Sequence, residues 1–224
     1  MITTRIPGEL PRTSVHYKAA ARAQTSTTGK LFIAVMLVVI YEGAIRKWVA
    51  DSSTLPLILL RDGLAAFTVA RAFWLGHFKR HRLISQIALA WSCCVIGWGL
   101  LQLTLGHSSF SIFLIGLRFW LLYLWFAIAA AAAMTERDYT VSLRFLLYSV
   151  VLMAPLAVLQ RQTPPGSPFN KTLEGDPEAA FTVVAGVVRA TGTFSFTAGF
   201  TTFLALCSPF VLGVLEARKR EASH

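Results

Sequence analysis

Charged side chains lie inside segments of this chain that are otherwise apolar enough to cross a bilayer. They are Glu42, Arg46, Arg61, Asp62 and Arg118. A charge at the bilayer centre costs at least about 2.5–3.5 kcal/mol on insertion scales, so such residues rarely lack a role. Arginine is also the side chain best suited to bidentate contact with phosphate. The pattern predicts a mostly basic cluster placed to bind an anionic lipid headgroup.

The depths of these charges predict a single layer. At a rise of about 1.5 Å per residue, Glu42 lies roughly 9 Å below one end of its predicted helix, and Arg118 roughly 12 Å below the start of its own. The same count places Arg61 and Asp62 roughly 10–12 Å deep. Three helices thus bring charge near the same face of the membrane.

The composition of the chain is that of an integral membrane protein. Of its 224 residues, 55% are hydrophobic and only 14% are charged, whereas soluble domains usually contain about 25% charged residues. The formal net charge of +10 could indicate a nucleic-acid partner. The basic residues, however, alternate with hydrophobic runs, which argues against nucleic acid and is typical of topology signals.

The apolar runs predict an all-α fold, a polytopic transmembrane helical bundle of about six spans. A spanning helix needs about 20 mostly apolar residues. We assign the spans to residues 30–48, 54–75, 83–105, 110–134, 140–159 and 198–215. Residues 1–29 and 216–224 are then basic tails, residues 30–159 hold the first five spans, and residues 160–197 form an outer loop. The polar start of the chain indicates an uncleaved first span.

The distribution of basic residues predicts the orientation of the bundle. With the N-terminus inside, most of the 21 Lys and Arg residues lie in cytoplasmic segments, so the positive-inside rule places both termini in the cytoplasm. Arg46 and Lys47 depart from this rule, because they flank the outer end of the first span. A basic pair at a position that topology disfavours is better explained by chemistry.

The outer loop 160–197 is the long connection between predicted spans. Pro164, Pro165 and Gly166 end the preceding helix with a tight bend. An acidic stretch and the apolar residues 181–188 follow, and Arg189 closes the run. A loop of this length is usually functional or disordered, and its apolar stretch favours a functional element that is re-entrant or interfacial.

The sequence does not indicate metal chemistry. Cys93, Cys94 and Cys207 lie in apolar runs without ligand spacing, so we interpret them as small packing residues. His107, the only histidine in an outer segment, is typical of a turn in its Gly-His-Ser-Ser context. We therefore expect no metal and no cofactor, and we assign no catalytic base.

The balance of charge in the layer leaves a positive surplus. Glu42 and Arg46 are four residues apart and can pair on one helix face. Arg61 and Asp62 point about 100° apart around their helix, so they should seek different partners. With Arg118 and the adjacent Lys47 included, four positive side chains face two negative ones, a surplus that suits a diphosphate ester.

The alternative interpretation is that these charges form interhelical ion pairs that fix the packing of the helices. For a pair such as Glu42 with Arg61, both interpretations stay open. For Arg118, and for Arg189 if its loop folds back, we favour ligand binding. Residual cationic charge in an apolar layer needs an anion, a water-filled cavity or a route for snorkelling.

Three motifs resemble the O-antigen polymerase/ligase-like family of membrane proteins found with exopolysaccharide synthesis. Residues 41–48 (YEGAIRKW) resemble the first-helix signature of that family. Residues 164–171 (PPGSPFNK) resemble its outer-loop turn, and residues 189–196 (RATGTFSF) the stretch that leads into the next span. The three motifs occur in the family's order, and together they are more specific than any one alone.

The resemblance implies a multi-pass glycosyltransferase of the bacterial cytoplasmic membrane. Such proteins join polyprenyl-diphosphate-linked oligosaccharides on the outer side, where an acceptor hydroxyl attacks the anomeric carbon and polyprenyl diphosphate leaves without a metal. Carried onto this chain, the resemblance makes Arg189 the main diphosphate contact and Gly192 a point of close backbone approach. Arg46, Lys47, Arg61 and Arg118 would supply the positive field, with Glu42 and Asp62 as structural ion-pair partners.

Members of this family are usually much longer and carry a second large outer loop after this region. We therefore expect the chain to be the N-terminal half or one subunit of a polysaccharide polymerase or ligase. Its partners would be the lipid-linked oligosaccharide, membrane lipid, and a second half or other polysaccharide-synthesis proteins. Two alternatives are a non-catalytic accessory protein and a transporter subunit, although no repeat-related pair of broken spans favours the latter.

Overall fold

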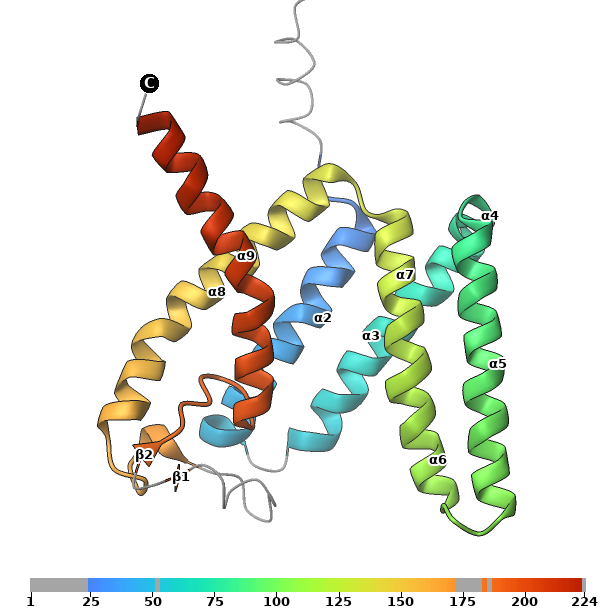
Figure 1. Ribbon diagram of the computed structural model, residues 1–224, viewed down its shortest axis with the longest axis horizontal. Helices are drawn as coiled ribbons and strands as arrows, with labels where there is room; N and C mark the ends of the chain where they lie inside the picture. The colour runs from blue at the N-terminus through green and yellow to red at the C-terminus, as the bar shows by residue number, and fades with distance from the viewer. Residues whose placement is uncertain (1–23, 51–52, 172–182, 185–186, 223–224) are drawn as a thin grey trace, which may run out of the picture.

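The computed structural model describes residues 24–50, 53–171, 183–184 and 187–222, and this part of the chain is all-α apart from one small hairpin. Figure 1 shows long helices that run back and forth between two ends of a bundle. In chain order the elements are α2 (Thr27–Ala44), the π-helical η1 (Ile45–Val49), α3 (Thr54–Trp74), α4 (His77–Arg80), α5 (Arg82–Thr104), α6 (Phe110–Leu117), the π-helical η3 (Arg118–Leu122), α7 (Tyr123–Ala133), α8 (Glu136–Gln162), the 3-10 turn η4 (Pro168–Asn170), β1 (Val183–Val184), β2 (Val187–Val188) and α9 (Thr197–Ala222).

Five helical segments of the described chain are long and apolar enough to cross a membrane. They are Thr27–Val49, Arg82–Thr104, Phe110–Ala133, Glu136–Gln162 and Thr197–Glu216. The helix α3 is of similar length and runs alongside them in Figure 1, but it carries Arg61, Asp62 and Arg71. The predicted all-α bundle is confirmed, and the chain is a multi-pass membrane protein by the length and composition of these helices.

Figure 1 also shows that α2 begins and α9 ends at the same end of the bundle. The starts of α2 and α8 are joined there, because Ser26 donates its backbone N–H and its hydroxyl to Asp138 at 2.8 and 2.6 Å. Asp138 is the third residue of α8 and also caps that helix with Thr135. The turns at this end are therefore fixed by side chains as well as by chain connectivity.

Several predicted boundaries differ from the observed ones. The helix α8 begins four residues before the predicted span 140–159 and continues past it, and Pro155 does not end it. Proline is tolerated in such helices because neighbouring groups satisfy the freed backbone carbonyl. The helix α9 also continues to Ala222, so residues 216–222 extend the helix where we predicted the start of a tail. Most of the predicted tail 1–29 lies outside the described residues.

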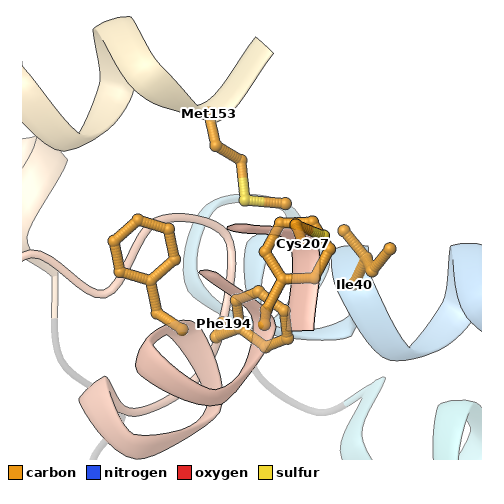
Figure 2. Packing of buried hydrophobic residues seen from close by; sticks show 6 residues of the cluster. Ile40, Met153, Phe194 and Cys207 are labelled. Atoms are coloured by element: carbon orange, nitrogen blue, oxygen red, sulfur yellow. The ribbon is translucent and has the colours of Figure 1, made fainter. Parts of the chain in front are cut away.

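The main core cluster joins α2, α8, α9 and the segment before α9. It contains Ile40, Met153, Phe194, Phe200, Phe203 and Cys207, and Figure 2 shows these side chains packed together. Cys207 is 3% exposed, as expected of a packing residue, whereas Cys93 and Cys94 are exposed on α5. Close packing matters here because helices in lipid gain little from the hydrophobic effect alone.

Candidate functional site

The first helix changes its winding where its charged residues begin. The α-helix α2 ends at Ala44, and residues Ile45–Val49 form a π-helical turn. Such turns are rare and occur frequently at functional sites. Glu42 lies just before this turn and Arg46 within it, and Nη1 of Arg46 lies 3.6 Å from Oε1 of Glu42. The ion pair expected from their spacing therefore forms within the helix.

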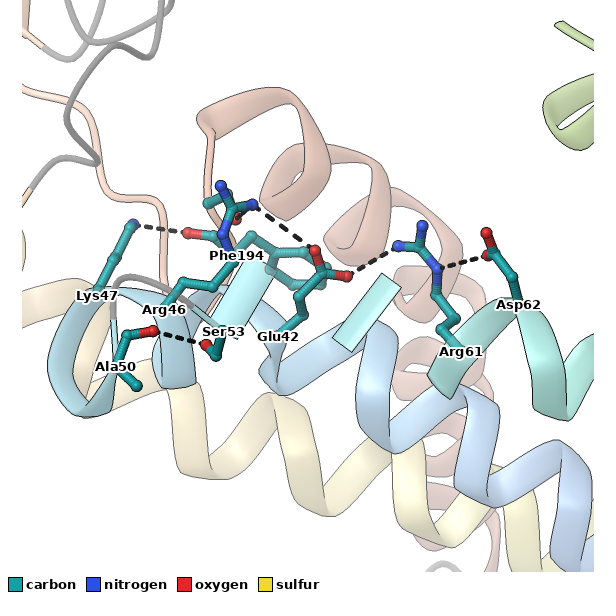
Figure 3. A network of polar contacts seen from close by, with 9 residues as sticks. Glu42, Arg46, Lys47, Ala50, Ser53, Arg61, Asp62 and Phe194 are labelled. Carbon is teal, nitrogen blue, oxygen red and sulfur yellow. Dashed lines mark hydrogen bonds and ion pairs between the residues drawn. The ribbon is translucent and has the colours of Figure 1, made fainter. Parts of the chain in front are cut away.

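An ion-pair chain extends from this point and joins residues of four elements, α2, η1, α3 and η3, as Figure 3 shows for its first members. Nη1 of Arg61 on α3 lies 2.8 Å from Oε2 of Glu42, and its Nε lies 3.3 Å from Oδ1 of Asp62. Nε of Arg118, at the start of η3, lies 2.5 Å from Oδ2 of Asp62. The ion-pair chain thus contains Arg46, Glu42, Arg61, Asp62 and Arg118.

Two details of this ion-pair chain differ from the sequence-based expectation. Arg61 and Asp62, which we expected to seek different partners, also contact each other. Arg118, which we favoured as a ligand contact, has Asp62 as an acidic partner. The depth of a residue follows from counting along its helix, but the rotation of the helix does not. The hydroxyl of Tyr123, which sequence reasoning missed, also donates to Asp62 at 2.5 Å.

The ion-pair chain carries more positive than negative charge. Three guanidinium groups face two carboxylates, and the side chains are between 11% and 23% exposed. Arg46 has the weakest contact with a carboxylate, at 3.6 Å, and donates from Nη1 to the hydroxyl of Ser195 at 3.2 Å. Its Nε is buried without a hydrogen-bond partner among the described residues. Arg46 is therefore the arginine of the ion-pair chain whose charge is least compensated by a carboxylate.

Lys47 fastens the segment before α9 to the first helix. Its ammonium group donates to Oγ1 of Thr191 at 2.7 Å and to the carbonyl of Phe194 at 2.6 Å, and the residue is only 2% exposed. The hydroxyl of Thr193 donates to the carbonyl of Ile40 at 2.6 Å. We expected Lys47 to add to the positive field around a ligand, and its hydrogen bonds show that it also holds this segment in place.

Gly43 lets the same segment approach the helix closely. A Cβ atom at this position would lie 2.3 Å from the backbone nitrogen of Ser195 and 2.4 Å from the carbonyl carbon of Phe194. Any larger residue would therefore push the segment away from α2. The close approach brings the hydroxyl of Ser195 within reach of Arg46, a contact that sequence reasoning did not find.

Gln160 at the end of α8 supports the segment from its other side. Its Oε1 accepts hydrogen bonds from the backbone N–H groups of Thr191 and Gly192, at 3.1 and 2.8 Å, and the residue is 1% exposed. Gly192 has a φ of +57°, in the left-handed region that favours glycine. A Cβ atom on Gly192 would meet the ring of Phe200 at 3.0 Å. Gly192 is thus buried, and it does not line the cavity described below.

Arg189 stands apart from the other predicted site residues. It follows β2, its side chain is exposed, and it does not line the cavity described below. The strands β1 and β2 before it pair as a short antiparallel hairpin. The acidic residues predicted for this loop, Glu174, Asp176 and Glu178, lie outside the described residues.

A cavity of about 650 Å³ opens between α2, α8 and α9, with the ion-pair chain at one end. Glu42, Arg46, Arg61 and Ser195 form its polar end. Its walls are apolar and include Phe32, Met36, Leu146, Phe203, Leu206 and Phe210. From Phe32 to Arg46 along α2 the lining extends roughly 20 Å at the rise of an α-helix. The shape and lining suit an amphipathic anion with a long apolar tail.

The cavity offers few groups for acid–base or metal chemistry. Among the described residues, Glu42 is the one carboxylate in its lining, and it is ion-paired with Arg46 and Arg61. In the described part of the chain, no group of three or more His, Cys, Asp or Glu side chains is arranged to hold a metal ion. The site as described can bind and orient an anion, and it offers no unpaired carboxylate to accept a proton.

Comparisons with family models, curated proteins and solved structures give no match to this chain. The resemblance of the three motifs to the O-antigen polymerase/ligase-like family therefore stays a prediction. The geometry of the cavity and its charges carries the functional argument.

Proposed function

We propose that the chain binds polyprenyl-diphosphate-linked oligosaccharide in the cavity between α2, α8 and α9. In this proposal it takes part in glycosyl transfer as the N-terminal half or a subunit of a polysaccharide polymerase or ligase. The observation that carries the proposal is the combination of a cationic end and long apolar walls in one cavity.

The charge of the cavity supports a diphosphate ligand. The ion-pair chain holds one more guanidinium than carboxylate, and Lys47 adds a second positive charge close behind it. A diphosphate diester carries two negative charges and would balance this surplus. Arg46 lines the cavity and has the longest carboxylate contact of the three arginines, so it is the residue that we assign to the phosphate oxygens.

The apolar walls support a polyprenyl tail. The cavity volume of about 650 Å³ is within the range of about 300–1,000 Å³ common for small-ligand sites. The walls supplied by Phe32, Met36, Phe203 and Leu206 would contact the isoprene units nearest the diphosphate. The rest of a long tail would extend into the lipid.

The arrangement of the helix ends supports a site on the outer side of the membrane. The polar end of the cavity lies near the end of α2, whereas α2 begins and α9 ends at the opposite end of the bundle (Figure 1). The basic segment 79–82 lies at that opposite end, and the positive-inside rule assigns such segments to the cytoplasm. We infer that the bacterial cytoplasmic membrane is the location and that Arg46 faces outward.

The proposed reaction needs a contribution from elsewhere. The acceptor hydroxyl would form a bond to the anomeric carbon as the bond from that carbon to the diphosphate oxygen breaks. Arg46 would stabilise the charge that develops on the leaving diphosphate. The proton of the hydroxyl would go to a base from a second half or subunit, since Glu42 is held in its ion pairs.

Ligand-induced stabilisation of the purified protein tests the binding step. We expect farnesyl diphosphate to raise the unfolding temperature more than farnesol or inorganic pyrophosphate, because only farnesyl diphosphate offers both an anionic head and an apolar tail. Arg46→Gln should weaken binding about tenfold or more, the usual size of a lost charge-assisted hydrogen bond. Arg144→Gln, an exposed arginine on α8, is the matched control. Equal stabilisation by farnesol would overturn the proposal.

The second candidate is a non-catalytic accessory protein that holds the lipid-linked intermediate. Glu42 lines the cavity as an ion-paired carboxylate, and this pairing favours the second candidate. Both candidates predict binding of farnesyl diphosphate, so binding alone does not separate them. Transfer by the purified chain together with a candidate second half does, because an accessory protein would bind the lipid there without supporting transfer.

A further inference from the structure

A second and larger cavity, of about 990 Å³, lies between α3, α4, α5 and α7. Its walls are mostly apolar and include Val69, Phe73, Trp74, Leu89, Leu122 and Trp125. Lys79, Arg82, Ser85 and Gln86 complete its lining with polar groups. Like the first cavity, it combines apolar walls with basic side chains, but it uses different helices.

This cavity lies at the opposite end of the bundle from the ion-pair chain. Figure 1 shows α4 at the end where α2 begins. Arg71, near the end of α3, donates to the hydroxyl of Thr28 in the first turn of α2 at 3.0 Å. The basic residues of the two cavities therefore lie at opposite ends of the bundle.

The turn that carries the basic residues is fixed in the bundle. Gly76 has a φ of +73° and separates α3 from the short helix α4. Phe78 on α4 is only 9% exposed and packs edge-on against Trp125, with ring centroids 5.3 Å apart. The hydroxyl of Ser85 donates to the carbonyl of Phe78 at 3.0 Å. These contacts position Lys79 and Arg82 on the lining of the cavity.

The basic residues of this turn carry uncompensated charge. Lys79, Arg80 and Arg82 are exposed, and no acidic side chain in the described part of the chain forms an ion pair with them. Two of them, Lys79 and Arg82, line the cavity, whereas Arg80 does not. A site with two free cations beside apolar walls is complementary to an anion with an apolar tail.

The apolar part of the ligand would come from the bilayer. Phe73, Trp74 and Leu89 are 69%, 78% and 58% exposed although they line the cavity, so its wall is continuous with the outer surface of these helices. In a membrane that surface faces lipid. We propose that the cavity binds an anionic glycerophospholipid, with its phosphate on Lys79 and Arg82 and an acyl chain between α3, α5 and α7.

A topology signal alone does not account for this arrangement. The positive-inside rule requires basic residues near the end of a span, but it requires neither a cavity nor a fixed orientation of the side chains. Arg80 provides the internal comparison, because it belongs to the same basic run without lining the cavity. The proposed lipid site is independent of the proposed glycan function and stands on its own residues.

Lipid retention by the purified full chain tests the proposal. After reconstitution with equal amounts of phosphatidylglycerol and phosphatidylcholine, bound lipids are counted by native mass spectrometry. We expect the wild type to retain phosphatidylglycerol preferentially. Lys79→Gln with Arg82→Gln should reduce that retention at least about tenfold, since the two substitutions remove the charge-assisted contacts proposed for the phosphate.

Two further variants separate a built site from general attraction. Lys30→Gln with Arg80→Gln removes the same amount of charge from exposed residues outside the cavity and should leave retention unchanged. Ala70→Phe should displace the acyl chain by filling the cavity while every charge remains. If that variant fails to fold, the charge variants still decide the question.

Three outcomes would overturn the proposal. One is equal retention of the two lipids by the wild type. Another is the same loss in both charge-removing double variants, which would indicate nonspecific attraction. The third is full competition by sn-glycerol 3-phosphate, which has the phosphate without acyl chains and would show that the cavity binds a soluble anion.

Discussion

Nη1 of Arg61 lies 2.8 Å from Oε2 of Glu42, so an ion pair joins α2 and α3, the first two long helices among the described residues. Arg61 reaches Asp62 as well, and both carboxylates of the ion-pair chain are thereby engaged. This pair therefore has a structural role, and Arg46 is left as the arginine whose charge is least compensated by a carboxylate. Arg61 thus stabilises the packing of the helices, whereas Arg46 is the arginine assigned to the ligand.

The Glu42–Arg61 pair should be visible as a coupling in stability. Glu42→Gln leaves Arg61 in an apolar layer without its strongest partner, and we expect a loss of up to about 3 kcal/mol. This is below the value for fully buried pairs because the two side chains are 11% and 15% exposed. Arg61→Gln should then lower the free energy of unfolding of the Glu42→Gln variant by less than it lowers that of the wild type. Unfolding in detergent, measured for both single variants and the double variant, checks the coupling, and strictly additive losses would contradict it.

Lys47→Met should loosen the segment before α9. The variant keeps the apolar stem of the side chain but leaves the carbonyl of Phe194 and the hydroxyl of Thr191 without the ammonium donor. Each unsatisfied buried group costs about 1–3 kcal/mol. We expect faster hydrogen exchange in residues 191–196, measured by mass spectrometry. The control is Lys30→Met, an exposed lysine at the start of α2, and equal exchange in both variants would argue against the fastening role.

Gly43→Ala should separate the same segment from α2 by steric pressure. The new Cβ would lie 2.3 Å from the backbone nitrogen of Ser195, and overpacking of this kind costs about 1–3 kcal/mol. Gly63→Ala on α3 is the matched control, because a Cβ there meets nothing within 4 Å. Alanine is favoured over glycine in helices by up to about 1 kcal/mol, so the control should be neutral or stabilised. Thermal unfolding of the two variants in the same detergent checks the prediction: the unfolding temperature should fall for Gly43→Ala and should stay the same or rise for Gly63→Ala.

The sequence predicts the helices and the charged layer because both depend on local information. Apolar runs identify the helices, and the spacing of Glu42 and Arg46 is sufficient to predict their ion pair. The contact between Asp62 and Arg118 depends on how two helices are rotated toward each other, which residue counts do not give. The position of a side chain along its helix is therefore easier to predict from sequence than the direction in which it points around the helix axis.

The hydrogen bonds that hold the segment before α9 were not predicted from the sequence, for a different reason. Lys47 contacts residues 144 and 147 positions away, and Gln160 binds backbone groups 31 and 32 positions away. These hydrogen bonds exist only when Gly192 takes its left-handed conformation and turns the segment back. Neither residue type nor spacing indicates such a turn, although the motif 189–196 marked the segment as important.

Arg189→Ala tests the assignment that came from motif resemblance and not from the cavity. Arg189 is exposed, so we expect the abundance and unfolding temperature of the protein to stay unchanged. If Arg189 contacts the diphosphate during transfer, loss of that contact should reduce polymer formation about 10–100-fold, the effect of about 1.5–3 kcal/mol. Arg161→Ala, an exposed arginine at the end of α8, is the control and should leave polymer length normal. Polymer size in producing cells, compared at equal protein level, gives the answer. Wild-type polymer from Arg189→Ala together with its loss in Arg46→Gln would move the diphosphate contact from the motif to the cavity that Arg46 lines.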